Sequence, residues 1–426
     1  MPSAAPGRLA RTDQLRAKSS PALVPNPGAM RMPYPARLRS TMSIERAQES
    51  RRWLASWKGI ASQATPLYDL PGLAREMGVG RISIKDESVR SPLGSFKALG
   101  APIALVRQIL RLHPHFDPAV ILTGGHARQL QDYTVISATD GNHGRSLAAA
   151  ARDAGCRCVI VLHAHVSAER ESAIAAFGAQ ILRTAGNYDA SVVQAARLAA
   201  ANGWQVVSDT SYDGYEDIPR DVMQGYGVIA AEIVEQTGAQ PGAAGAFTHV
   251  LLQGGVGGLA AGLASYLWEY QGENRPHFIV VEPAQADCLL QSAIQGQAAK
   301  ATGSVDSVMA GLACGETSAL AWQFLHASID HFMTIGDGQA IEAMRTLARG
   351  NGRDIPVVAG ESGSAGLAAL QMLCAEPELA AQVGLDAHSR VLAVNTEGAT
   401  APRLYQELVG ESAAAVQRRQ AAWLAD

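Results

Sequence analysis

Lysine is scarce in this chain, which has 5 lysines against 30 arginines among its 426 residues. The sequence also lacks an excess of either charge: the formal net charge is -4 and the pI is about 6.3, which speaks against a broad basic face for nucleic acid. The five cysteines form no CxxC pair, and a set this sparse is typical of reduced thiols in a cytosol. At 47% hydrophobic residues, we expect a globular protein of two domains.

Targeting and membrane segments are also missing. The first residues lack the apolar run of a secretory signal, and residues 1–22 are rich in Ala, Arg, Pro and Ser, so a disordered start is expected and a transit peptide is the alternative. Residues 241–268 carry no charge, but His249, Gln253 and many glycines interrupt them. They predict a buried strand followed by a buried helix and not a membrane span. We therefore expect a cytoplasmic protein that does not bind membranes.

Apolar strand-like runs alternate with Ala-rich helical runs through most of the sequence, which predicts an α/β fold with parallel sheets and crossover helices. Strands are expected at 81–86, 133–140, 156–165, 179–186, 204–211, 248–253, 277–283 and 390–398. Helices are expected at 95–112, 144–155 and 221–238. Two more are expected between these, one that ends at 177 and one that ends at about 202. Four strand–helix units between 106 and 215 form one expected domain, and residues 23–105 with 216–426 form the other.

A glycine-rich stretch, residues 248–262, reads as a strand, a turn and a helix. The N–H groups of such a turn, together with a helix N-terminus, bind phosphate. From Gly255 the stretch matches GxGxxA, and Glu282 ends the next predicted strand 27 residues later, as in a dinucleotide-binding motif. This motif alone leaves a nicotinamide dinucleotide and a smaller phosphate such as pyridoxal phosphate open, as well as glycines used only for packing.

Lys97 lies in the stretch SPLGSFKALG, at the start of a predicted helix with Ser95 as the N-cap. A lysine in a first helical turn is disfavoured by the helix dipole, and burial disfavours its charge further. Both effects predict a neutral amine, which is the form that reacts with an aldehyde to give a Schiff base. The alternative is a lysine whose ammonium reaches water.

The turn SATDGNHG, residues 137–144, combines a hydroxyl, a carboxylate and an amide with several N–H groups. Its N–H groups and the Thr139 hydroxyl suit a substrate carboxylate, and Asn142 suits a phenolate oxygen. Asp140 beside an anion site suggests proton transfer, although it is equally suited to cap the next helix. In the loop 207–219, Asp209 ends a predicted strand and suits a cationic group, whereas Asp213 and Asp217 fit an ordinary solvated loop.

Seven short blocks together resemble the fold-type II pyridoxal-phosphate enzymes, the tryptophan synthase β / threonine dehydratase superfamily, and within it the diaminopropionate ammonia-lyases. The blocks are KDES (85–88), LGSFKALG (93–100), SATDGNHG (137–144), DTSYDGYEDIP (209–219), QGGVGGLAAG (253–262), GESGSAGL (360–367) and NTEGAT (395–400). TDGNHG is the block that distinguishes the diaminopropionate ammonia-lyases, since threonine dehydratases and cysteine synthases typically have a small residue at the position of Asp140. The resemblance implies two open, mostly parallel α/β domains with the cofactor in the cleft between them.

The resemblance also implies roles for individual residues. Lys97 would hold the cofactor aldehyde as a Schiff base beside Phe96, Asn142 would contact its ring oxygen, and Thr396, or alternatively Thr400, would face the pyridine nitrogen. The phosphate would lie on Gly254, Gly255, Val256, Gly257 and Gly258. The substrate would be bound by Thr139, Asp140, Gly141, His143, Asp209 and Tyr215.

The implied activity is pyridoxal-phosphate-dependent α,β-elimination of 2,3-diaminopropionate, D or L or both, to pyruvate and ammonia. Lys97 would act on one face of the substrate and Asp140 on the other, with Asp209 or Asp140 holding the leaving ammonium. The family resemblance also implies a homodimer. The alternatives are a serine/threonine dehydratase on the same fold, a nicotinamide dehydrogenase, and a non-catalytic protein that binds either cofactor. We expect no metal, since the pairs at 113/115 and 163/165 have no evident third ligand.

Overall fold

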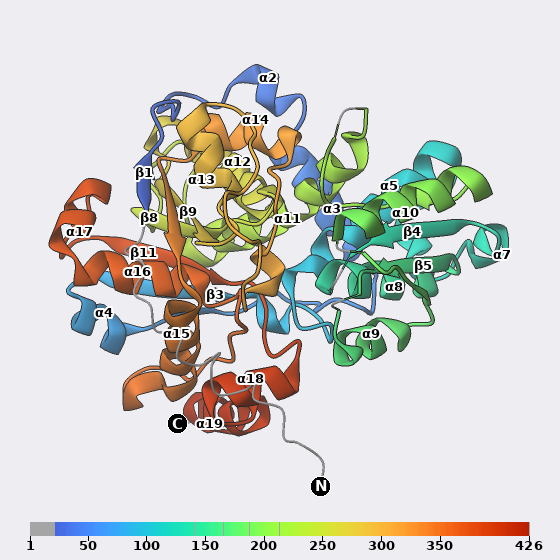
Figure 1. Ribbon diagram of the computed structural model, residues 1–426. Helices are drawn as coiled ribbons and strands as arrows, with labels where there is room; N and C mark the ends of the chain where they lie inside the picture. The colour runs from blue at the N-terminus through green and yellow to red at the C-terminus, as the bar shows by residue number, and fades with distance from the viewer. Residues whose placement is uncertain (1–21, 140, 165, 187, 213, 426) are drawn as a thin grey trace, which may run out of the picture.

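The computed structural model describes residues 22–425 with the exception of 140, 165, 187 and 213, and Figure 1 shows its arrangement around two sheets. The expected disordered start, 1–22, lies outside the described residues except for Ala22. The Ala22 carbonyl accepts a hydrogen bond of 2.9 Å from the Thr334 N–H, and disorder of the start stays a prediction. Asp140 likewise lies outside the described residues.

The larger sheet has seven strands in the order β1-β10-β9-β8-β11-β3-β2. The strands are β1 (Leu23–Pro25), β2 (Leu67–Asp69), β3 (Arg81–Asp86), β8 (His249–Gln253), β9 (His277–Pro283), β10 (His331–Ile335) and β11 (Arg390–Asn395). The strands from β10 to β3 pair in parallel, and the short edge strands β1 and β2 pair antiparallel. The central strands are buried on both faces, which explains their continuous apolar runs in the sequence.

The smaller sheet is fully parallel, in the order β6-β5-β4-β7. Its strands are β4 (Thr134–Ala138), β5 (Arg157–Leu162), β6 (Gln180–Arg183) and β7 (Gln205–Val206). All four lie between 106 and 215, although helix α5 (Ala101–Leu112) crosses the first of those limits. The division of the chain into domains at these residues stays a prediction.

The two sheets lie side by side, each with its own helices, and the smaller sheet is on the right of Figure 1. Around the smaller sheet are α5, α6 (Pro118–Ile121), α7 (Ala127–Leu130), α8 (Asn142–Ala154), α9 (Ala168–Ala175) and α10 (Tyr188–Asn202). The other helices are α2 (Ala36–Arg39), α3 (Ile44–Leu54), α4 (Pro71–Met77), α11 (Asp217–Thr237), α12 (Gly258–Gln271), α13 (Cys288–Gln295), α14 (Ala319–Ser328), α15 (Asp337–Arg349), α16 (Ala365–Ala375), α17 (Pro377–Val383), α18 (Pro402–Val409) and α19 (Ala413–Ala425).

The helix expected at 95–112 is wrong at its start. A short 3₁₀ turn, η2 (Phe96–Leu99), precedes Gly100, and α5 begins only at Ala101 with a proline in its first turn. Proline has no N–H to continue a hydrogen-bond ladder from the preceding turn, so it starts a new helix there. The strand expected at 204–211 is also too long: β7 has two residues, and the chain then turns into the loop that carries Asp209.

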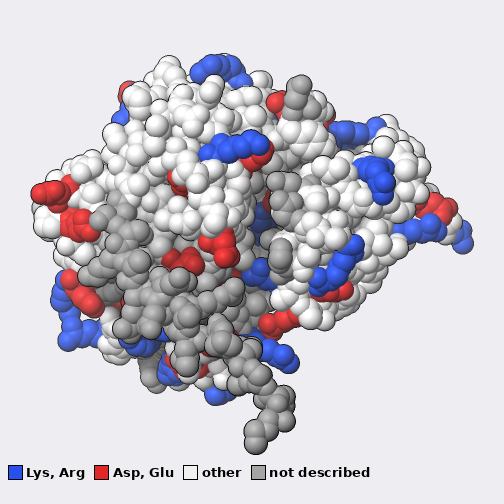
Figure 2. All heavy atoms as spheres, in the orientation of Figure 1, with Lys and Arg blue, Asp and Glu red and all other residues white. Residues whose placement is uncertain are grey.

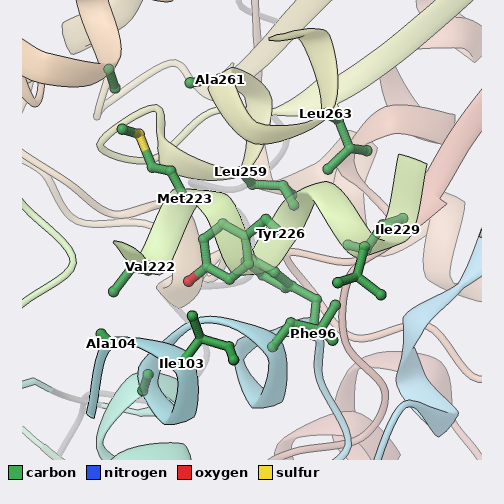
Figure 3. Packing of buried hydrophobic residues seen from close by; sticks show 14 of the residues in the cluster. Phe96, Ile103, Ala104, Val222, Met223, Tyr226, Ile229, Leu259, Ala261 and Leu263 are labelled. Atoms are coloured by element: carbon green, nitrogen blue, oxygen red, sulfur yellow. The ribbon is translucent and has the colours of Figure 1, made fainter. Parts of the chain in front are cut away.

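The turn η2 packs directly on α11. Figure 3 shows the ring of Tyr226, from α11, among apolar side chains of α5, α11 and α12. The rings of Phe96 and Tyr226 lie 4.7 Å apart. A Cβ added at Gly225 would lie 2.1 Å from the Leu99 carbonyl oxygen, so only glycine allows the two backbones to approach this closely. This packing fixes the position of Lys97.

A buried network of charges supports the segment that precedes this turn. The ammonium of Lys85, in β3, lies 2.7 Å from the carboxylate of Glu232 in α11, and Arg90 bridges that carboxylate to Glu87 at 2.6 and 2.8 Å. All four side chains are at most 3% exposed. Buried charges are tolerated only when they are paired in this way.

The outer surface is mixed in charge. On the face shown in Figure 2, Lys and Arg alternate with Asp and Glu in small groups, and neither sign forms a broad patch. None of the helices in the described part of the chain is both long and apolar enough to cross a bilayer. The uncharged stretch 241–268 forms the buried strand β8 and the buried helix α12, as predicted.

Candidate active site

Lys97 is held at the carboxyl end of β11. The N–H of Phe96 donates to the Thr396 carbonyl at 3.0 Å, and Ser95 pairs with Glu397 in an antiparallel bridge. The Ser95 side chain makes no capping bond, contrary to the expectation, and its buried hydroxyl has no hydrogen-bond partner among the described residues. Backbone pairing to β11 therefore positions the lysine, at the edge where open α/β sheets carry their sites.

The Lys97 ammonium is paired with Asp209. Its Nζ lies 2.5 Å from Oδ2 of Asp209, and the two side chains are 18% and 20% exposed. Burial by itself lowers the pKa of Lys97, but the Asp209 carboxylate outweighs it and raises that pKa above its ordinary value. In turn, Lys97 holds the pKa of Asp209 below its usual range although burial opposes this. The predicted neutral amine is therefore wrong for the protein without cofactor, because the prediction did not include Asp209, which lies 112 residues away in the sequence.

His143 lies behind this pair. Its Nε2 contacts the Val207 carbonyl at 2.9 Å, and its Nδ1 lies 3.8 Å from Oδ2 of Asp209. The ring is 4% exposed, and burial lowers the pKa of His143. A carbonyl only accepts, so the neutral ring carries its proton on Nε2 and turns an unprotonated Nδ1 toward Asp209. The imidazole thus packs against the acid.

The turn before α8 brings Asn142 to the larger sheet. Its amide donates to Oε2 of Glu397 at 2.5 Å, across 255 residues of sequence. The Thr139 side chain is buried, and its hydroxyl accepts a long hydrogen bond of 3.4 Å from the Gly141 N–H. The N–H groups at the start of α8 have no partner within the helix, which suits an anion.

Hydrogen bonds of Tyr215 hold the backbone just before Asp209. Its hydroxyl accepts from the Ser208 N–H at 2.9 Å and donates to the Val206 carbonyl at 3.1 Å, while its ring stacks on Tyr212 at 4.8 Å. Burial raises the pKa of Tyr215. The hydroxyl of this predicted substrate-binding residue is thus engaged with the backbone, and the ring is the part left to contact a ligand.

The glycine-rich turn between β8 and α12 has the form of an anion cradle. Gly257 has a φ of +102°, and a Cβ there would lie 2.7 Å from a Leu325 methyl, so glycine is required. The N–H groups of 255–258 have no protein acceptor among the described residues. Gly254 differs, since its N–H donates to the Val281 carbonyl at 2.7 Å. The place of Gly254 in the phosphate cradle stays a prediction.

Glu282 is not placed to bind a ribose. It is fully buried, and its carboxylate accepts from the N–H groups of Leu289 and Leu290 at 2.9 and 2.8 Å, which caps α13. Burial raises its pKa to about 8. The second element of the dinucleotide motif is thus used to hold a helix.

The residues present fit pyridoxal phosphate. The turn between β8 and α12 has a cradle of unpartnered N–H groups, η2 supplies an amine and the start of α8 supplies an amide, as a phosphate, an aldehyde and a phenolate oxygen require. Thr396 is buried at the end of β11 beside Phe96, whose ring lies 5.3 Å from the Lys97 ammonium. Thr400 instead directs its hydroxyl to Glu397 at 3.4 Å.

Two acids in this region were not predicted, although their blocks GESG and NTEG were recognised. Glu397 and Glu361 are 4% and 2% exposed. Burial, with the neighbouring Glu397 carboxylate, raises the pKa of Glu361 to about 7. Arg170 of α9 reaches Oε1 of Glu361 at 3.2 Å. No group of three His, Cys, Asp or Glu residues in the described part of the chain is arranged to hold a metal ion.

Comparison with known proteins gives the family. A family model described as pyridoxal-phosphate-dependent enzyme matches residues 61–397. The chain belongs to this family. It is a fold-type II enzyme that uses pyridoxal phosphate, as predicted, and the nicotinamide alternative is excluded.

Individual relatives are similar over most of their length. A diaminopropionate ammonia-lyase of Salmonella typhimurium (strain LT2) is 38% identical over 367 residues, which is 84% of this chain and 90% of the relative. The holo crystal structure of diaminopropionate ammonia lyase from Escherichia coli superposes with a TM-score of 0.82 at 35% identity, covering 92% of this chain and 96% of that one. A further structure of that enzyme, in complex with an aminoacrylate-PLP azomethine reaction intermediate, matches at 0.80 and 34%, covering 92% and 97%.

Proposed function

We propose that this enzyme eliminates ammonia from 2,3-diaminopropionate and yields pyruvate and a second ammonia. The observation that carries the proposal is the pairing of Lys97 with Asp209 at 2.5 Å. A carboxylate that already holds an ammonium at this position suits a substrate with two amino groups. When one amino group reacts at the cofactor, the other is left for Asp209. Serine and threonine offer a hydroxyl there, which gains much less from a carboxylate.

The cofactor would be held by residues of both sheets. Lys97 would bind its aldehyde, Asn142 would contact its ring oxygen and Thr396 would face its pyridine nitrogen. Its phosphate would lie on the N–H groups of Gly255, Val256, Gly257 and Gly258. When bound, pyridoxal phosphate supplies the electron sink for a carbanion at the substrate Cα.

Substrate binding prepares Lys97 for proton transfer. In the protein without cofactor, the Asp209 carboxylate is the largest of the influences that raise the pKa of Lys97. With the β-ammonium of the substrate on Asp209, the Lys97 amine that is released from the cofactor lacks this stabilisation of its charged form, so it stays neutral and can take the Cα proton. Asp140 would serve the opposite face, so that both D and L substrates react.

The remaining groups orient the substrate. Its carboxylate would lie on the Thr139 hydroxyl and on the N–H groups of Gly141 and His143, at the start of α8. The Tyr215 ring forms a wall beside Asp209. As the bond from Cβ to nitrogen breaks, Asp209 holds the departing group until it leaves as ammonia, and the released enamine hydrolyses to pyruvate.

The test is an absorbance spectrum of the purified protein with pyridoxal phosphate, before and after addition of D- or L-2,3-diaminopropionate, with a pyruvate assay. We expect a band of bound cofactor that is absent in Lys97→Ala, and pyruvate from diaminopropionate but not from threonine. Activity on serine or threonine alone would keep the fold and refute the substrate. A protein that takes up no cofactor would refute the whole proposal.

We further propose that the enzyme works as a homodimer in the cytoplasm. The sparse cysteines, none of which forms a disulfide in the structure, support a reducing compartment. Sedimentation equilibrium tests the dimer: a monomer at micromolar concentration contradicts it.

A further inference from the structure

Glu397 has no part in the reaction described above, although it lies in the middle of the site. It follows β11 directly, and its side chain is 4% exposed. Its backbone pairs with Ser95, two residues before the lysine, and its carbonyl accepts from the Gly360 N–H at 2.8 Å. Backbone contacts to the segment before η2 and to the segment before α16 therefore fix the position of this residue.

The carboxylate of Glu397 receives only donors. Oε2 accepts from the Asn142 amide at 2.5 Å and from the Thr400 hydroxyl at 3.4 Å, and Oε1 accepts from the Ser362 N–H at 3.2 Å. Both oxygens are needed as acceptors, which a carboxylate provides and a glutamine does not, because one end of its amide is an NH₂. The chemistry of the surroundings thus requires an acid here.

This contact decides which way the Asn142 side chain faces. An asparagine amide has a donor end and an acceptor end of similar shape. A carboxylate accepts only, so Glu397 binds the NH₂ end and forces the carbonyl oxygen to the other side. One N–H of Asn142 is used in this bond, and the second remains to donate at a fixed angle. A reversed amide would turn its carbonyl oxygen toward a ring oxygen and repel it.

We propose that Glu397 is a positioning residue, which orients the Asn142 amide so that it donates to the ring oxygen of the cofactor. The inference rests on the proposed role of Asn142 in cofactor binding. The bond also connects the segment after β11 of the larger sheet to helix α8, which lies beside the smaller sheet. Glu361 is the matched neighbour: it is equally buried, but it is paired with Arg170 and makes no hydrogen bond to Asn142.

A double-mutant cycle tests this role. Glu397→Gln, Asn142→Ala and the double variant are prepared without cofactor and titrated with pyridoxal phosphate. The dissociation constant and the absorbance maximum of the bound cofactor are recorded for each. We expect either single change to weaken binding about tenfold, the value of one hydrogen bond to a charged group, and to shift the absorbance maximum in the same direction. The double variant is expected to be no worse than Asn142→Ala.

Glu361→Gln is the control. It is expected to leave the effect of Asn142→Ala unchanged, since it does not act through that amide. Effects of Glu397→Gln and Asn142→Ala that multiply, or a Glu397→Gln protein with wild-type affinity and spectrum, would overturn the inference. If Glu397→Gln does not fold, Glu397→Asp keeps two acceptor oxygens and goes through the same cycle.

Failure of the underlying function is seen separately. A wild-type protein that takes up no pyridoxal phosphate overturns both proposals together. A wild-type protein that binds it, with an additive cycle, overturns only the role of Glu397. Thermal unfolding of the cofactor-free variants distinguishes a purely structural effect from a positioning effect. A purely structural effect would lower the unfolding midpoint of Glu397→Gln but leave the absorbance maximum of its bound cofactor unchanged.

Discussion

Replacement of Asp209 by asparagine separates the two duties that we propose for this acid. The change removes the negative charge 2.5 Å from the Lys97 ammonium and keeps the size of the side chain. Removing one partner of a buried ion pair costs about 3–5 kcal/mol, and the partial exposure of both side chains favours the lower end of that range. Because one pKa unit corresponds to about 1.4 kcal/mol, the pKa of Lys97 is expected to fall by about two units.

This shift is measurable as the pH dependence of cofactor uptake. Only the neutral amine reacts with an aldehyde, so the rate at which the cofactor-free protein acquires its absorbance band rises as Lys97 loses its proton. In Asp209→Asn the midpoint of this rise is expected at lower pH than in the wild type. A midpoint that does not move would show that Asp209 does not control the charge of Lys97.

The second duty appears in the kinetics. Loss of the contact to the substrate ammonium is expected to lower kcat/KM for diaminopropionate by about a hundredfold, since a truncated partner of a charged hydrogen bond costs about 2–5 kcal/mol. Any residual activity on serine, which has no second ammonium, is expected to fall much less. Equal losses on both substrates would refute the assignment of Asp209 to the amino leaving group.

Three further predictions concern the support of the site. Glu232→Gln breaks the buried charge network and is expected to lower the free energy of unfolding in urea by about 3–5 kcal/mol. Glu235→Gln, on the same helix but in an exposed pair with Arg51, is expected to lower it by less than about 1 kcal/mol. Similar losses in the two variants would contradict the importance of the buried network. Gly257→Ala is expected to weaken pyridoxal phosphate binding in a fluorescence titration, because its φ of +102° and the Leu325 methyl exclude a Cβ, and unchanged affinity would argue against the cradle. Burial lowers the pKa of His277 to about 4, so the unfolded chain binds more protons below about pH 6.5 and stability falls as pH falls. This histidine alone is expected to remove about 2 kcal/mol of unfolding free energy between pH 7 and 5, and a His277→Gln protein with the same pH profile would contradict it.

Local patterns in the sequence were enough for most of the fold. Parallel strands buried on both faces read as continuous apolar runs, so β3 and β8 were predicted within a residue of their observed limits. The short edge strands β1 and β2 have three residues each and carry no comparable signal. The break at Gly100 was missed because an apolar helical period continues through it, and the packing that needs it comes from α11.

The site was predictable as a set of residues but not as a set of contacts. Lys97, Asn142 and Asp209 each lie in a short block with its own chemical logic, and the structure brings the blocks together. The partners of these residues could not be predicted, because Lys97 and Asp209 are 112 residues apart in the sequence and Asn142 and Glu397 are 255 apart. No local period encodes such pairs, so the charge of the lysine was predicted wrongly and Glu397 received no role.

The pairing of Lys97 with Asp209 gives the proposed reaction an order. Oδ2 of Asp209 has one cation at 2.5 Å in the structure. In the cofactor-free protein this cation is Lys97, and in the substrate complex it is the β-ammonium. After the bond to nitrogen breaks, ammonia leaves without charge and Asp209 is left buried and unpaired, which is costly. Pairing of the protonated Lys97 with Asp209 removes that cost, and Lys97 must lose this proton again before its neutral amine can react at the cofactor in the next cycle.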